Sequence, residues 1–107
     1  MDDAEFDRLA RDELQHLEDA LSDLDPDECE VSSSDGVLKL ALRDGTRIVI
    51  NSHRAARQIW MAAIATAWHF DPPSADRASW HASRTTEDLR PTLARVLRER
   101  IGLAVTL

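Results

Sequence analysis

The chain has 107 residues, 43% hydrophobic and 31% charged, with a net charge of −7, which is the composition of one globular domain and not of a disordered tail. No apolar run approaches the ~18 residues that a membrane-spanning helix needs, which argues against a membrane partner. The first residues lack the basic and apolar regions of a signal peptide, and the single Cys29 cannot form an internal disulfide, so we expect a cytoplasmic protein.

The first predicted element is a helix over residues 3–24. Its apolar residues recur at steps of three and four: Phe6, Leu9, Ala10, Leu14, Leu17, Leu21 and Leu24. Asp2 or Asp3 suits the N-cap position, and Pro26 predicts that the helix has ended by that point.

The middle of the chain alternates apolar and polar residues, as half-buried strands do. We expect strands over residues 28–33, 37–43, 46–51, 58–63, 67–71 and 79–82. Asp35-Gly36 and Asp44-Gly45 separate the first three and are typical of hairpin turns. The alanine-rich residues 61–67 are also compatible with a helix.

A second helix is predicted over residues 86–101. Its apolar face consists of Leu89, Leu93, Val96, Leu97 and Ile101. Thr85 and Thr86 are candidate caps, Pro91 must lie in the first turn, and Gly102 is a candidate C-terminal stop. The order of elements predicts one α+β domain over residues 1–107: a two-layer sandwich with both terminal helices on one face of an antiparallel sheet of five to six strands.

Charge is distributed unevenly along the chain. Residues 1–30 carry a net charge of −11, whereas the remaining residues carry +4. Such asymmetry indicates an acidic surface that faces a cation or a basic partner, and it argues against nucleic acid, which binds through Lys and Arg.

The acids of the first helix form one line. At 100° per residue, four acids of the predicted helix fall within about 40° of one another and away from the apolar stripe: Glu5, Asp12, Asp19 and Asp23. We call the line and its continuation into the first strand the acidic ridge: Glu5, Asp12, Asp19, Asp23, Asp25, Asp27, Glu28 and Glu30. An ordinary solvated polar face is the alternative. Two observations argue against it: no Lys and only two Arg are interleaved, and Asp19 and Asp23, four residues apart, repel each other in a helix.

Carboxylate ligands suit hard cations such as Mg²⁺, Mn²⁺ or iron. Carboxylates on a convex helix cannot surround one ion, so we expect weak, shallow binding at several positions. His16 lies one turn from Asp12 and from Asp19 and is a possible additional nitrogen ligand; an exposed histidine without a metal role is the alternative.

Strand alternation also predicts a polar-aromatic patch on the open face of the sheet. If Ile59 points into the core, Gln58 and Trp60 point outward, beside Asn51 of the preceding strand. A large exposed aromatic ringed by amides resembles a binding hot spot. A register shifted by one residue would instead place Trp60 in the core.

Several spaced segments together resemble the frataxin family. They are Ile50-Asn51, Gln58-Ile59-Trp60-Met61-Ala62, His69-Phe70-Asp71 and Trp80. The opening Glu5-Phe6-x-Arg8-Leu9-Ala10, Cys29 after an acidic stretch, and Asp35-Gly36-Val37-Leu38 are similar to the bacterial CyaY-type branch. The resemblance implies the same sandwich fold and a role in iron–sulfur cluster assembly. It also implies weak iron binding, with other divalent cations as possible substitutes. A further implication is association with a cysteine desulfurase and its scaffold protein, on which this chain would modulate the rate of cluster assembly.

The resemblance also implies positions for these sites. The acidic metal site falls on Glu18, Asp19, Asp23, Asp25, Asp27, Glu28 and Glu30, and the scaffold-facing residues are Asn51, Gln58 and Trp60. The sequence departs from the family at Ser22, where relatives have an acid, and at residues 63–67, which replace a glycine-containing turn. We expect a monomer, with an iron-dependent oligomer as the alternative.

We expect no enzyme and no catalytic residues. Cys29 has no histidine nearby in sequence and no phosphate-binding glycine loop is present. Two alternatives stay open: a regulator that binds proteins without metal, and a haem or transition-metal protein. The second would use a spatial cluster drawn from His16, His53, His69, His81 and Cys29.

Overall fold

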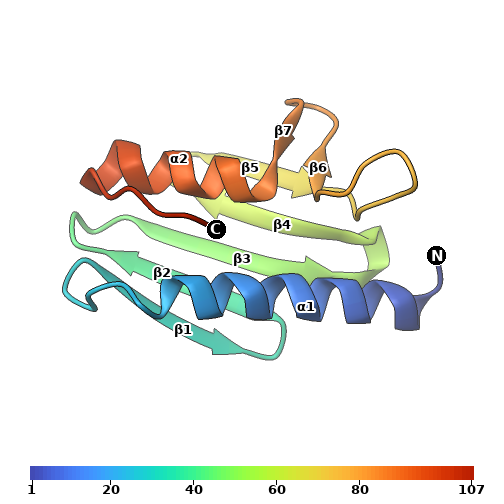
Figure 1. Ribbon diagram of the computed structural model, residues 1–107, viewed down its shortest axis with the longest axis horizontal. Helices are drawn as coiled ribbons and strands as arrows, with labels where there is room; N and C mark the ends of the chain where they lie inside the picture. The colour runs from blue at the N-terminus through green and yellow to red at the C-terminus, as the bar shows by residue number, and fades with distance from the viewer.

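Two helices lie on one face of an antiparallel sheet in the computed structural model, which describes residues 1–107 (Figure 1). The helices are α1 (Asp3–Leu21) and α2 (Leu89–Ile101). The sheet has the order β1-β2-β3-β4-β5, with bounds Cys29–Ser34, Val37–Leu42, Arg47–His53, Gln58–Ala63 and Thr66–Phe70. A short 3-10 helix, η1 (Arg54–Ala56), joins β3 to β4, and β6 (His81–Ala82) pairs with β7 (Glu87–Asp88) as a separate ribbon. The α+β two-layer prediction is confirmed.

Helix α1 begins as predicted and ends earlier than predicted. The Asp2 side chain caps it by accepting a hydrogen bond of 2.8 Å from the backbone N–H of Glu5. The helix ends at Leu21 and not at residue 24, because Ser22 donates its hydroxyl to the carbonyl of Asp19 and the chain then turns. Asp23 therefore lies beyond the helix.

Helix α2 begins three residues later than predicted. Thr86 has a φ of +59°, which no helical residue adopts, and Asp88 takes the N-cap position in place of Thr85 or Thr86. Pro91 lies in the first turn, where its missing N–H costs least. Gly102 ends the helix with a φ of +68°, as predicted.

The core lies between the helices and the sheet. Alternate strand residues face it, among them Ile48, Ile50, Ile59 and Met61, none of which is more than 1% exposed. The alanine-rich residues 61–67 form the end of β4 and the start of β5, so the strand interpretation holds and the helical one is wrong. Asn51 pairs with Trp60 across β3 and β4, which places both on the face opposite the helices.

The last six residues run back along the groove between the two helices (Figure 1). Leu103, Val105 and Leu107 pack against the core, and the intervening Ala104 and Thr106 are exposed. Neither α1 nor α2 combines the length and the apolar composition that crossing a bilayer requires.

Candidate functional site: an acidic ridge and an open sheet face

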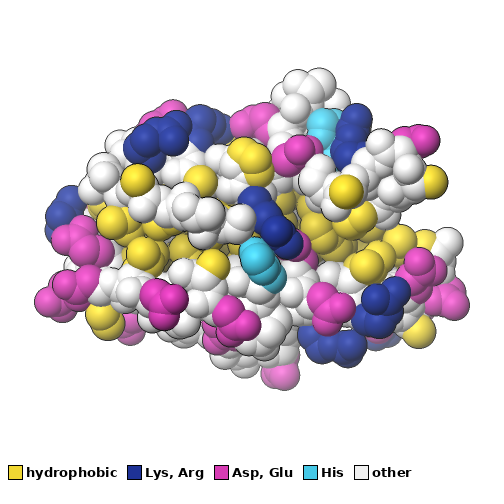
Figure 2. All heavy atoms as spheres, in the orientation of Figure 1, with side chains coloured by type: hydrophobic (Ala, Val, Ile, Leu, Met, Phe, Trp, Pro, Cys, Tyr) yellow, Lys and Arg dark blue, Asp and Glu magenta, His cyan; other side chains and the backbone are white.

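The acidic ridge lies along α1 and the edge strand β1, and most of it carries no compensating charge. Of its members only Glu28 forms an ion pair, at 2.9 Å from the guanidinium of Arg43. The other seven have no basic side chain within 4.0 Å: Glu5, Asp12, Asp19, Asp23, Asp25, Asp27 and Glu30. Figure 2 shows acidic side chains spread along the α1 half of one face, beside hydrophobic atoms in the groove between the helices.

The acids gather at the end of α1 where negative charge is least favourable. The last turn of α1 contains no basic residue but holds Glu18 and Asp19, and Asp23 and Asp25 follow directly. Because the helix dipole is negative at this end, each added carboxylate there is disfavoured. Asp23 lies outside the helix, so this effect replaces the predicted i, i+4 repulsion between Asp19 and Asp23.

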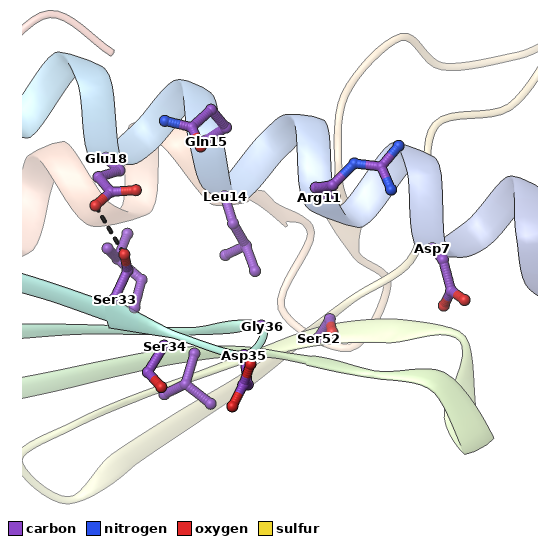
Figure 3. Close-up of a pocket in the computed structure, with 12 residues that line it drawn as sticks. Asp7, Arg11, Leu14, Gln15, Glu18, Ser33, Ser34, Asp35, Gly36 and Ser52 are labelled. Atoms are coloured by element: carbon purple, nitrogen blue, oxygen red, sulfur yellow. Dashed lines mark hydrogen bonds between the residues drawn. The ribbon is translucent and has the colours of Figure 1, made fainter.

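Glu18 does not belong to the exposed line. It lies on the flank of α1 that faces the sheet, and it accepts a hydrogen bond of 2.7 Å from the hydroxyl of Ser33 (Figure 3). The two side chains border a hollow of about 530 Å³ between α1 and the β1–β2 turn. Glu18 is therefore bonded to the sheet, unlike the exposed acids that the resemblance groups with it.

The ridge holds no preformed chelating cluster. No three His, Cys, Asp or Glu side chains of the chain are grouped as ligands for one ion. Asp25 accepts a hydrogen bond of 2.9 Å from the backbone N–H of Asp27, which fixes the turn before β1. The exposed carboxylates thus suit weak contact with hard cations at the surface and do not form an enclosed metal centre.

His16 lies on the side of α1 that faces α2. It lines a hollow between the two helices together with Asp12 and Glu13, and Asp19 is not among the lining residues. His16 nevertheless stays within one helical turn of both Asp12 and Asp19, since all three lie in α1.

The open face of the sheet carries Asn51, Gln58 and Trp60 side by side, in the predicted register. The indole N–H of Trp60 donates to the side-chain oxygen of Gln58 at 2.9 Å. The amide of Gln58 in turn donates to Asp71 at 3.0 Å. This chain of hydrogen bonds fixes the orientation of the indole ring.

Trp60 is half-buried, and its surroundings differ from those predicted. Its indole is stacked between two imidazoles, with ring centroids 3.8 Å from His53 and 4.3 Å from His69 and interplanar angles of 14° and 16°. The expected bare aromatic ringed by amides is instead a three-ring stack that exposes ring edges. We call His53, Trp60 and His69 the aromatic stack. Strand pairing brings the three rings together, since His69 is directly opposite Trp60 and His53 is opposite Gln58.

The open sheet face differs in charge from the ridge. Lys39 and Arg47 point outward from β2 and β3 and have no ion-pair partner. Among the outward strand residues the one acid is Glu30, at the edge in β1, while Asp71 just beyond β5 is bonded to Gln58. Two cations and two acids thus share the open face, which therefore lacks the one-sided negative charge of α1.

The structure does not support a catalytic or haem-binding cluster. Cys29 is 2% exposed, and burial raises the pKa of its thiol, which keeps it protonated and unreactive. His53 and His69 come together, but the indole of Trp60 separates them. His81 is bonded to Asp88 at 2.7 Å and serves the start of α2.

The comparisons with known proteins decide the family. The model of the frataxin-like domain matches residues 1–103. The chain belongs to the frataxin-like family. The iron–sulfur cluster assembly protein CyaY of Dechloromonas aromatica is 35% identical over 107 residues, which cover 100% of this chain and 99% of the relative. The CyaY of Thioalkalivibrio sulfidiphilus is 43% identical over 89 residues, covering 83% and 78% of the two chains.

Solved frataxins share the fold. The frataxin of Psychromonas ingrahamii superposes with a TM-score of 0.87 over 98% of this chain and 96% of its own, at 21% identity. The trimeric frataxin of Saccharomyces cerevisiae, solved with ferrous iron, superposes with a TM-score of 0.74 at 30% identity, over 88% of this chain and 86% of its own. The frataxin-like family is non-enzymatic, which confirms the expectation of a binding protein.

Proposed function

We propose that this frataxin-like chain is an iron–sulfur cluster assembly protein with two working surfaces. The acidic ridge contacts iron weakly and docks onto a basic surface of a cysteine desulfurase. The open sheet face, with Asn51, Gln58 and Trp60, docks onto the scaffold protein. Family membership and the CyaY relatives support the role in cluster assembly.

One observation carries the proposal: uncompensated acids concentrate at the C-terminal end of α1. Asp19 and Asp23 stand where the helix dipole disfavours them, and no arginine neutralises either. Acids at the start of the same helix do have arginine partners, since Asp3 is paired with Arg57 and Asp7 with Arg54. Asp19 accepts one hydrogen bond of 2.9 Å, from the neutral amide of Gln15, which leaves its charge uncompensated. A charge that is unfavourable for folding and has no cationic partner within the chain is best explained by a cationic ligand or partner.

The absence of a grouped ligand set supports iron as cargo at the surface and not as a resident cofactor. Protein docking is consistent with the same ridge, because complementary charge raises association rates and fixes orientation without any enclosed site. A docking ridge that contacts iron only incidentally is thus the second candidate function.

Anaerobic titration with Fe²⁺, followed by paramagnetic broadening of amide NMR signals, tests the iron-binding part. We expect selective loss of signals from residues 12–30 and none from the aromatic stack. The variant Asp12→Asn/Asp19→Asn/Asp23→Asn should show much less broadening. Broadening centred on His53 and His69, or unchanged in the variant, would contradict iron binding at the ridge and leave docking as the function of its charge.

A further inference from the structure

The turn between β4 and β5 holds an unfavourable residue. Ala63 pairs with Thr66, which leaves Ile64 and Ala65 as a two-residue loop, and Ile64 has a φ of +58°. A β-branched side chain is strongly disfavoured in this backbone region. In the other connections of the sheet, positive φ values fall on Asp35, Gly36 and Gly45, which accept them more easily, and on Arg57, which is not β-branched.

The same residue is also unusually exposed. Ile64 is 69% exposed, and the one other exposed large hydrophobic side chain is the N-terminal Met1, at 50%. A lone exposed isoleucine needs no explanation by itself. An exposed isoleucine that also strains its turn is disfavoured twice for folding, and strain of this kind is typical of functional positions.

The surroundings of Ile64 are basic and continue the open sheet face. Ile64 shares a hollow of about 430 Å³ with Arg47 and Arg100; Arg100 is held by Asp44, whereas Arg47 has no acidic partner. Directly behind the tip, the cross-strand pair Ala62 and Ala67 faces outward and leads toward Trp60. Ile64 is four residue steps along the chain from Trp60, a distance of roughly 13 Å that one interface of ordinary size spans.

We propose that Ile64 is a second anchor of the scaffold-binding face and enters an apolar pocket bordered by carboxylates on the scaffold protein. The inference rests on the proposed function and extends the predicted surface from Asn51, Gln58 and Trp60 to the hairpin tip. Ile64 supplies the apolar contact, and the unpaired Arg47 supplies charge complementary to an acidic rim. The flat strip of small residues between the aromatic stack and the tip lets both ends contact one partner.

Calorimetric titration of the full chain with purified scaffold protein, alone and in complex with the desulfurase, tests the inference. Ile64→Gly and Ile64→Asn remove the apolar side chain and place residues that tolerate a positive φ. We expect at least about ten-fold weaker scaffold binding, as for the loss of a buried anchor side chain, with a urea midpoint equal to or above that of the wild type. Arg47→Gln should weaken binding less than the Ile64 variants do, and its difference from the wild type should vanish at high salt.

Thr86→Gly is the matched control. Thr86 is also β-branched and exposed and has a φ of +59°, but it lies in the β6–β7 ribbon, away from the sheet face. It should change stability in the same way and leave scaffold affinity unchanged.

Wild-type affinity in both Ile64 variants, or loss of affinity together with a lower urea midpoint, would overturn the inference and leave the proposed function intact. If the wild-type chain bound neither the scaffold protein alone nor its complex with the desulfurase, the inference and the proposed scaffold docking would both be overturned.

Discussion

At the scale of single residues, Trp60 shows how neighbours decide what a partner can touch. Both faces of its indole are covered by the imidazoles of His53 and His69, and Gln58 holds its N–H. A partner therefore meets the ring edge and cannot stack on the ring. Because the orientation is fixed before binding, little side-chain entropy is lost when the interface forms.

Removal of one histidine should uncover one face of the indole. In His69→Ala we expect stronger quenching of tryptophan fluorescence by iodide, since Trp68 and Trp80 are only 7% and 4% exposed and contribute little. The double variant Trp60→Phe/His69→Ala should show no such increase relative to Trp60→Phe. Unchanged quenching in the single variant would show that the aromatic stack is not maintained in solution.

The pairing of Asp88 with His81 predicts that the stability of the chain depends on pH. The hydrogen bond with His81 lowers the pKa of its carboxyl despite partial burial. A group with a lowered folded pKa stabilises the fold above its unfolded value, about 3.9 for Asp, and this contribution is lost as the pH falls through the folded pKa.

We therefore expect the urea midpoint of the wild type to decrease as the pH is lowered below about 4. The decrease should be smaller in Asp88→Asn over the same pH range. Asp76→Asn, an exposed acid without an ion pair, is the control and should keep the wild-type profile. Identical profiles for Asp88→Asn and the wild type would refute the assignment.

Strand alternation was enough to place Asn51, Gln58 and Trp60 on the open face, because the direction of a strand side chain is a local property. The aromatic stack could not be predicted in the same way. It depends on the pairing of β3 with β4 and of β4 with β5, which brings together residues that are 16 positions apart in sequence, from His53 to His69.

At the scale of elements, one ion pair joins the two helices. Glu13 of α1 is 6% exposed and accepts two hydrogen bonds, of 2.9 and 2.8 Å, from the guanidinium of Arg90 in α2. The sequence contained a hint, since Glu13 falls on the same helical stripe as Phe6, Ala10 and Leu17. Its partner could not be found, because Arg90 lies 77 residues away.

Arg90→Ala should destabilise the fold by about 2 kcal/mol, because it leaves a buried carboxylate without a partner. The value is below that for a fully buried pair, since the Arg90 side chain is 44% exposed. The double variant Glu13→Leu/Arg90→Leu should recover most of the loss. Urea unfolding measures both; a double variant as unstable as the single one would show that packing and not charge is at issue.

The helix boundaries show where local patterns are insufficient. Helix α1 ends at Leu21 because the Ser22 hydroxyl competes for a carbonyl, although the apolar period continues to Leu24. Helix α2 starts late because Glu87 is drawn into β7, where it accepts hydrogen bonds from Trp68 and Arg95. The second effect depends on contacts that are distant in sequence, so the apolar pattern alone could not reveal it.

At the scale of the whole molecule, the fold separates charge. The segment with a net charge of −11 forms α1 and the start of β1, and the ridge runs along it, whereas Lys39 and Arg47 stand on the open sheet face. Family membership, fold and charge separation were all visible in the sequence. The division of the acids was not: Glu28 is paired with Arg43 and Glu18 is bonded to Ser33, so the free ridge is narrower than the resemblance implies.

The affinity of the desulfurase for two charge-matched triple variants tests whether the free carboxylates of the ridge drive docking. One variant is Asp12→Asn/Asp19→Asn/Asp23→Asn; the other, Asp35→Asn/Asp76→Asn/Glu99→Gln, removes the same charge away from the ridge. We expect the ridge variant to bind at least about ten-fold more weakly at low salt and to lose most of the salt dependence of binding, while being as stable as the wild type or more stable. The control variant should bind like the wild type. Equal affinity of the two variants would contradict docking through the ridge.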